Sequence, residues 1–153
     1  MLGPFAWAAM ATLAVAAFAL SAIDLRTRRL PDVIVLPALV AVTGLLAADA
    51  ARAGVWWPWR RAVLCCVVSA LGHWLVWRVA RGGLGLGDVK LAGLLAFGLG
   101  YLGVAQVVLG VVAAFVLGAL AGLVLAWRSR RWDNTLAFGP WMCLGALLAV
   151  VIA

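Results

Sequence analysis

Long apolar runs separated by short polar segments make up most of the chain. A helix needs about 20 apolar residues to cross the roughly 30 Å hydrocarbon core of a bilayer. The pattern therefore predicts an all-α polytopic membrane protein, a bundle of about six transmembrane helices in a single domain over residues 1–153. The expected helices cover residues 5–23, 33–48, 62–80, 88–101, 104–127 and 136–153.

The fourth of these runs is short. At 1.5 Å per residue its 14 residues extend only about 21 Å, roughly 9 Å less than the hydrocarbon core. We therefore expect Asp88, at its start, to lie below the membrane surface. Gly98, Gly100 and Gly103 are expected to mark the turn that follows, and residues 49–61 are expected to form a loop with three interfacial tryptophans.

Composition supports a membrane protein and argues against other classes. The chain is 68% hydrophobic and only 11% charged, with a net charge of +7. The basic residues flank the apolar runs, so we expect the lipid bilayer as a partner and no nucleic acid. Cys65, Cys66 and Cys143 all lie in apolar runs without the spacing of a zinc site or a disulfide framework, and we expect no metal and no cofactor.

The basic residues also predict the orientation of the chain. Basic residues concentrate in cytoplasmic loops. We therefore expect Asp24, Asp32 and Asp88 at the cytoplasmic face and both termini on the outside. Nine bases lie at the ends assigned to the cytoplasm, namely Arg26, Arg28, Arg29, Arg78, Arg81, Lys90, Arg128, Arg130 and Arg131, and three lie at the other ends, namely Arg52, Arg60 and Arg61.

A glycine-rich segment leads into Asp88. Four of the six residues at 82–87 are glycine, between two apolar runs. Irregular backbone at membrane depth is tolerated where it lines a cavity or contacts a partner, because unpaired backbone groups in hydrocarbon are costly. Gly85 and Gly87 would let a substrate backbone lie close to Asp88. We interpret this segment as half of an active site.

Asp24 is the expected second half. It ends the first apolar run at the face where Asp88 begins the fourth, and an acid bordering lipid is by default a functional hypothesis. Two carboxyl groups that approach closely can hold a single proton between them. The ionised carboxylate then draws a proton from water, while the protonated carboxyl donates to the scissile carbonyl. The few serines and the single histidine form no competing pair.

Each of these residues also has a simpler interpretation. Asp24 would be a solvated residue at a helix end, and Asp88 a helix N-cap. Asp32 is expected to be the N-cap of the second helix rather than a catalyst. Lys90 would either extend to the interface or temper the charge beside Asp88. His73 is expected to be a hydrogen-bonded core residue.

Three motifs resemble those of the type IV prepilin peptidases, a family of intramembrane aspartyl proteases. Gly85-Leu86-Gly87-Asp88-Val89-Lys90-Leu91 resembles the family's GxGD signature. Asp24-Leu25-Arg26 followed by Leu30-Pro31-Asp32 resembles its first catalytic motif, and Phe138-Gly139-Pro140 resembles the motif of its last helix. The three occur in the family's order, and the resemblance covers nearly the whole chain.

The resemblance implies a function and a location. The catalytic acids would be Asp24 and Asp88, with Gly85, Gly87 and Lys90 in the active-site loop. The reaction would be removal of a prepilin or pseudopilin leader at the cytoplasmic face of the bacterial inner membrane. The size is similar to that of the short peptidases of Flp or tight-adherence pilus systems, so no methyltransferase domain is expected. Association into a homo-oligomer is left open.

Other functions fit parts of the same pattern. A preflagellin peptidase or a signal-peptide-peptidase relative would also carry a GxGD motif. A small transporter or channel would use Asp24 and Asp88 to bind a proton or cation. A structural assembly subunit would tolerate the loss of either acid.

The predicted orientation can be tested by thiol labelling. We expect a cysteine at Thr27 or Ser129, in a background without the native cysteines, to be shielded from an impermeant reagent in intact cells, because both would face the cytoplasm. A cysteine at Ala53 should be labelled. The opposite pattern would invert the topology.

Overall fold

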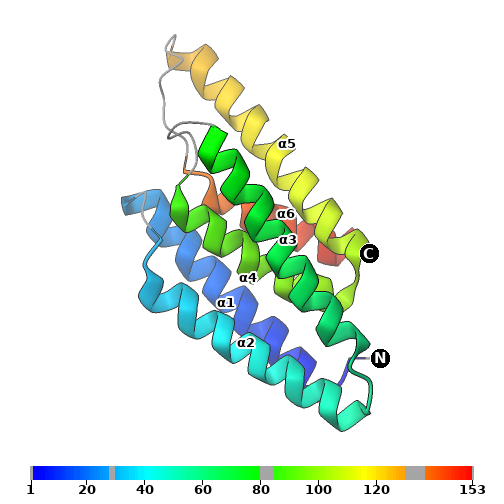
Figure 1. Cartoon of the computed structure of the whole chain (residues 1–153). Helices are drawn as coiled ribbons and strands as arrows, with labels where there is room; N and C mark the ends of the chain where they lie inside the picture. Colours follow the sequence, from blue (N-terminus) through cyan, green and yellow to red (C-terminus); the bar gives the residue numbers. More distant parts are fainter. Residues whose placement is uncertain (1, 28–29, 80–84, 130–136, 153) are drawn as a thin grey trace.

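Six helices and no strand occur within the residues that the computed structural model describes, which are 2–27, 30–79, 85–129 and 137–152. The expected all-α fold is confirmed, and α1, α2, α3 and α5 are each long and apolar enough to cross a membrane. The arginines at 28, 29, 81, 130 and 131 and the glycines at 82 and 83 lie outside the described residues. The helices are α1 (Pro4–Thr27), α2 (Asp32–Ala53), α3 (Trp57–Val79), α4 (Leu86–Leu102), α5 (Val104–Ser129) and α6 (Gly139–Ile152) (Figure 1).

The prediction of a loop at residues 49–61 is wrong, because most of these residues are helical. Helix α2 continues to Ala53 and α3 begins at Trp57. The turn is short because Gly54 adopts a left-handed conformation with φ of 69°, which a residue without a β-carbon adopts at little cost. The N–H groups of Gly54 and Val55 then donate to the last carbonyls of α2, at 3.2 and 3.1 Å.

The fourth helix is longer than expected, although it ends at Leu102, one residue beyond the expected end at Tyr101. Helix α4 begins two residues before Asp88 and has 17 residues, so it extends about 26 Å rather than 21 Å. It continues through Gly98 and Gly100, which serve packing instead of a turn. A β-carbon on Gly98 would strike the side chain of Leu13, and one on Gly100 would lie 2.7 Å from the Cβ of Cys65.

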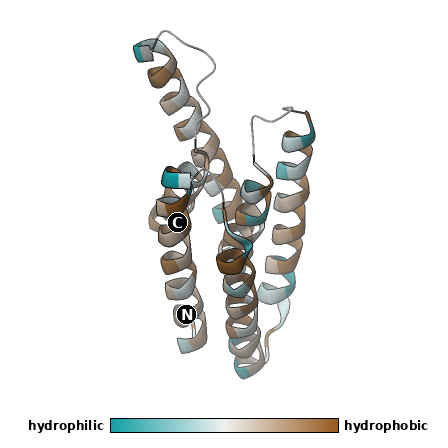
Figure 2. Ribbon diagram, turned by 90° about the vertical axis from the view of Figure 1, so that its left-hand side faces the viewer, coloured by the Kyte–Doolittle hydropathy of each residue, from teal (hydrophilic) through white to brown (hydrophobic). Residues whose placement is uncertain are grey.

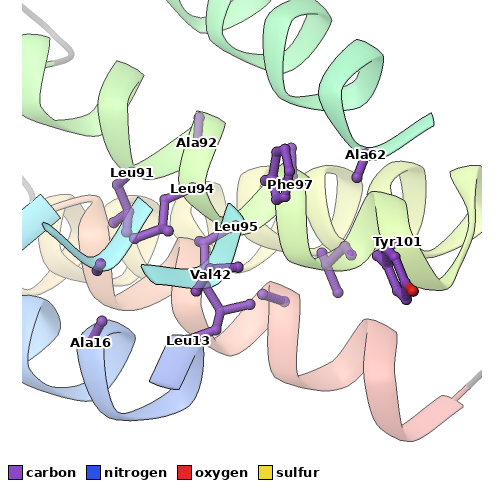
Figure 3. Close-up of a cluster of buried hydrophobic side chains, with 14 of the residues drawn as sticks. Leu13, Ala16, Val42, Ala62, Leu91, Ala92, Leu94, Leu95, Phe97 and Tyr101 are labelled. Carbon is purple, nitrogen blue, oxygen red and sulfur yellow. The ribbon is translucent and has the colours of Figure 1, made fainter. Parts of the chain in front are cut away.

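Helix α4 is the centre of the bundle. Twelve of its 17 residues are buried, and it contacts each of the other five helices. Its leucines belong to the buried apolar cluster shared with α1 and α2; Figure 3 shows Leu95 beside Val42 and Leu13, with Leu91 and Leu94 further along α4. A helix that is apolar on all sides can be buried against several neighbours at once.

The outer faces of the surrounding helices are apolar as well. The helices are mostly brown or pale between their ends in Figure 2. Large side chains such as Phe18, Val108, Leu120 and Leu147 are exposed. Apolar surface of this extent marks contact with a membrane or a partner, and the four long helices favour a membrane.

One end of the bundle, at the upper left of Figure 1, collects the end of α1 and the starts of α2, α4 and α6. Asp24 near the end of α1 is hydrogen-bonded to Gly139 at the start of α6. Asp32 at the start of α2 pairs with Lys90 in α4. The acids expected at one face therefore do lie at one end of the bundle.

The contact between α5 and α6 generates a stability prediction. A β-carbon on Gly145 of α6 would clash with the carbonyl oxygen of Gly110 and lie 2.7 Å from the backbone nitrogen of Ala114, both on α5. Because backbone atoms cannot move aside, we expect Gly145→Ala to lower the free energy of unfolding by about 1–3 kcal/mol. Thermal unfolding in detergent measures this.

Gly122 of α5 provides the matched control. A β-carbon there meets nothing within 4 Å, so Gly122→Ala should leave stability unchanged or raise it slightly. Equal unfolding temperatures for the two variants would contradict the close approach of α5 and α6.

Candidate active site

The buried face of α1 places Asp24 in the interior. Its buried residues recur every three or four positions, as expected for one face of a helix, and Asp24 is the last of them. Its side chain is 5% exposed. The Oδ2 atom of Asp24 accepts a hydrogen bond of 3.0 Å from the backbone N–H of Gly139. Asp24 is therefore a buried residue of the core, and the interpretation as a solvated helix end is wrong.

Asp88 lies in the first turn of α4. Gly85 is the N-cap residue, so the alternative that Asp88 itself is the N-cap is wrong. The Oδ2 atom of Asp88 accepts from the N–H of Gly85 at 3.0 Å, and the N–H of Asp88 donates to the carbonyl of Gly85 at 3.1 Å. Asp88 is 7% exposed, so both candidate acids are buried.

The fold brings Asp24 and Asp88 together. Helices α1 and α4 are in contact, and the two buried carboxyl groups lie at the same end of these helices. Each carboxylate has a donor from a helix start, where the free N–H groups favour negative charge. Among the described residues, no cluster of three or more His, Cys, Asp or Glu side chains is arranged to hold a metal ion.

Asp32 does not cap α2. Pro31 is the N-cap residue, and it makes no side-chain cap hydrogen bond. Asp32 is the first helical residue, and its Oδ1 atom instead accepts from Lys90 Nζ at 2.6 Å. The expected cap is wrong because the ammonium of Lys90 lies within reach of the carboxylate. This ion pair links α2 to the turn of α4 that carries Asp88.

The two active-site glycines differ in their surroundings. A β-carbon on Gly87 would lie 2.7 Å from the Cβ of Leu30, so the turn between α1 and α2 fills that space. Gly85 is exposed. Among the described residues, only the side chain of Asp88, three residues later, comes within 3.5 Å of a β-carbon placed on Gly85. Sequence reasoning missed Leu30, although it precedes the proline of a motif already singled out.

The Phe-Gly-Pro motif forms the start of α6. The carbonyl of Phe138 accepts from the N–H groups of Trp141 and Met142, at 3.1 and 3.2 Å. Pro140 is tolerated because the first N–H groups of a helix have no partner within the helix. The ring of Phe138 lies 5.2 Å from that of Phe115, centroid to centroid, and against Gly118.

His73 is the expected hydrogen-bonded core residue. It is buried, and its Nδ1 atom donates to the carbonyl of Ser69 at 2.9 Å, since a carbonyl can only accept. Its ring stacks on Phe115 at 5.6 Å. Burial of Asp49 was not expected, because residue 49 was assigned to the start of a loop, but Asp49 lies buried at the opposite end of the bundle.

The sequence of this chain matches the model of a known protein family. The model of the Type IV leader peptidase family matches residues 11–126. No solved structure matches the chain significantly.

Several curated proteins named prepilin leader peptidase/N-methyltransferase are similar to this chain. The one from Burkholderia pseudomallei strain 1026b is 39% identical over 142 residues, covering 87% of this chain and 42% of that protein. The one from Dickeya chrysanthemi is 35% identical, covering 88% and 47%, and the one from Escherichia coli K12 is 35% identical, covering 84% and 56%. The chain thus spans about half the length of these relatives.

The ion pair beside the site generates a second stability prediction. The side chains of Lys90 and Asp32 are 42% and 54% exposed. Because water screens such pairs, we expect Asp32→Asn and Lys90→Met to show a coupling of at most about 1 kcal/mol in a double-mutant cycle. Unfolding in detergent at low and high salt measures it, and salt should reduce it. A coupling of several kcal/mol that resists salt would contradict a solvated pair.

Proposed function

The chain belongs to the type IV leader peptidase family, and we propose that it acts as an intramembrane aspartyl endopeptidase on prepilin-like substrates. The observation that carries this proposal is the pair of buried carboxyl groups at one end of the bundle. Asp24 and Asp88 come from helices far apart in the sequence, and these two helices are in contact. Two acids that share a water molecule can serve as the general base and the general acid in the hydrolysis of a peptide bond.

The proposed reaction uses one proton shared between the two acids. Two neighbouring buried carboxyl groups cannot both ionise cheaply, so one stays protonated. The ionised group takes a proton from water as the water oxygen attacks the scissile carbonyl, and the protonated group donates to the carbonyl oxygen. The tetrahedral intermediate then breaks its C–N bond: the departing amine takes the proton held by one acid, and a hydroxyl of the intermediate gives its proton to the other acid, which restores the single shared proton.

The start of α6 would help to hold Asp24 for this reaction. The Gly139 N–H is bonded to Asp24, and the start of a helix favours a negative charge. The contact of Phe138 with Phe115 and Gly118 keeps that N–H in place. We therefore assign the Phe-Gly-Pro motif a supporting role.

The substrate would approach Asp88 over Gly85. Gly85 is exposed and has an extended backbone, with φ of −83° and ψ of 150°. An extended peptide can come close to such a glycine because no β-carbon intervenes. Gly87 is covered by Leu30, and Lys90 pairs with Asp32, so we propose that these two residues shape the site without binding the substrate directly.

The proposed substrates are prepilins or pseudopilins in the bacterial inner membrane. The site would face the cytoplasm, as the distribution of basic residues predicts. The names of the relatives combine leader peptidase with N-methyltransferase. We propose only the peptidase step for residues 1–153.

Substitution of the acids tests the proposal. Asp24→Asn and Asp88→Asn should each lower leader cleavage by about 100-fold or more, because each removes one member of the proton-sharing pair. The assay follows loss of the leader from a co-expressed prepilin on a gel, with membrane insertion confirmed separately.

Asp32→Asn is the matched control for these substitutions. It removes one carboxylate charge at the same end of the bundle, but from a solvated ion pair, so cleavage should persist at a useful fraction of the wild-type rate. An inactive Asp32→Asn beside an active Asp24→Asn would move the pair to Asp32 and Asp88. Proton or cation transport that depends on both acids, without any cleavage, would favour a transporter.

A further inference from the structure

A second buried polar cluster joins α2, α3 and α4 at the end of the bundle opposite the candidate active site. The hydroxyl of Tyr101, near the end of α4, donates to Oδ2 of Asp49 on α2 at 2.9 Å. Arg61 on α3 donates from Nε to the carbonyl of Gly100 at 2.8 Å and from Nη2 to that of Tyr101 at 2.7 Å. Figure 3 shows Tyr101 at this end, with Ala62 of α3 nearby.

Asp49 is an unfavourable residue to bury for stability alone. It is 5% exposed, and its Oδ1 atom is fully buried and has no hydrogen-bond partner among the residues that the structure describes. A buried polar atom without a partner destabilises the folded state, and an apolar residue of similar size would avoid that cost. Buried polar groups of this kind are best attested as devices that set the register between helices.

Arg61 holds the last turn of α4 from a second side. The last carbonyls of a helix have no partner within it, and a cation near them is favourable. The guanidinium binds two of these carbonyls at once, so it restrains both the rotation and the axial position of the helix end. Asp49 and Arg61 therefore restrain α4 from two neighbouring helices.

The packing of α4 on α3 explains why such restraint is needed. Small residues form this contact: a β-carbon on Gly93 would lie 3.6 Å from the Cβ of Ala70, and one on Gly100 would lie 3.1 Å from the Cα of Ala62. Small side chains allow close approach of two helices in a membrane. On this face they lack the bulk with which the leucines of α4 interlock with α1 and α2, so polar contacts supplement the packing against sliding along the helix axis.

We propose that Asp49, Tyr101 and Arg61 are positioning residues that set the axial position of Asp88 against Asp24. Tyr101 is thirteen residues from Asp88 on the same continuous helix, about 20 Å at 1.5 Å per residue. A stiff helix transmits a displacement of one end to the other. This inference rests on the proposed function, because it concerns the alignment of the proposed catalytic pair.

Steady-state kinetics of purified variants test the proposal. Tyr101→Phe removes only the hydroxyl and should lower kcat by about tenfold or more with little change in KM, because misplacement of a reacting group by about 1 Å affects the chemical step. Asp49→Leu should behave similarly. Asp49→Asn keeps an oxygen that can accept from Tyr101 and should retain most of kcat.

Trp59→Phe is the matched control. It removes the 3.3 Å hydrogen bond from Trp59 Nε1 to the carbonyl of Thr43, which joins α3 to α2 at the same end of the bundle without α4. It keeps a ring against Phe97. If Trp59→Phe and Tyr101→Phe lower the unfolding temperature alike but only Tyr101→Phe lowers kcat, the positioning role is supported. Equal effects of both variants on kcat would overturn it.

A cross-linking experiment reads the position of α4 without any activity. The Cβ separation of 3.6 Å at Ala70 and Gly93 suits a disulfide, so Ala70→Cys with Gly93→Cys should cross-link readily after the native cysteines are replaced. Adding Tyr101→Phe should slow cross-linking by about fivefold or more, since the geometry of a disulfide tolerates little displacement. Adding Trp59→Phe instead should leave the rate of cross-linking unchanged. An unchanged rate with Tyr101→Phe would overturn the proposal.

The two proposals fail differently in these experiments. A wild-type chain that cleaves no prepilin leader contradicts the proposed function, whatever the variants do. A wild-type chain that cleaves, with Tyr101→Phe equal to Trp59→Phe in kcat and in cross-linking, contradicts only the positioning role.

Discussion

A carboxylate inside an apolar bundle needs hydrogen-bond donors, and the arrangement of this molecule follows from how they are supplied. Asp24 and Asp88 are both buried, and each accepts an N–H group from the start of a helix. Free N–H groups at helix starts are donors that no neighbouring carbonyl already uses. Helices α4 and α6 must therefore begin at the depth where α1 ends. This brings together the three motifs that resemble those of the prepilin peptidases.

The central position of α4 depends on its small residues. Gly98 and Gly100 let α1 and α3 approach its backbone, and Gly87 accepts the side chain of Leu30. Close packing of this kind brings helices together in a membrane, where lipid is as apolar as the side chains. Polar contacts then act at both ends of α4, with Lys90 and Asp32 at one and Tyr101, Asp49 and Arg61 at the other. The helix that carries Asp88 is thus the most constrained element of the bundle.

Membership of the type IV leader peptidase family agrees with this arrangement. The matched residues include both candidate acids and the turn with Leu30, Pro31 and Asp32, and they end before the Phe-Gly-Pro motif. That motif contacts Asp24 directly in the structure, through Gly139. This contact explains physically why the motif stands at the start of α6: its backbone N–H binds Asp24, and the position of the motif in the sequence does not reveal this.

Apolar run length and the glycine-acid motif were enough to predict six helices and to select Asp24 and Asp88, because both signals are local. The helix ends at Ala53 and Trp57 were not predictable from the apolar pattern, and Gly98 and Gly100 read as a turn until their neighbours on α1 and α3 are known. The partner of Asp32 was missed for a similar reason: Lys90 is 58 residues away. Burial of Asp49 depends on Tyr101, which lies on another helix. Contacts between distant residues are decided by packing, and only the tertiary structure contains them.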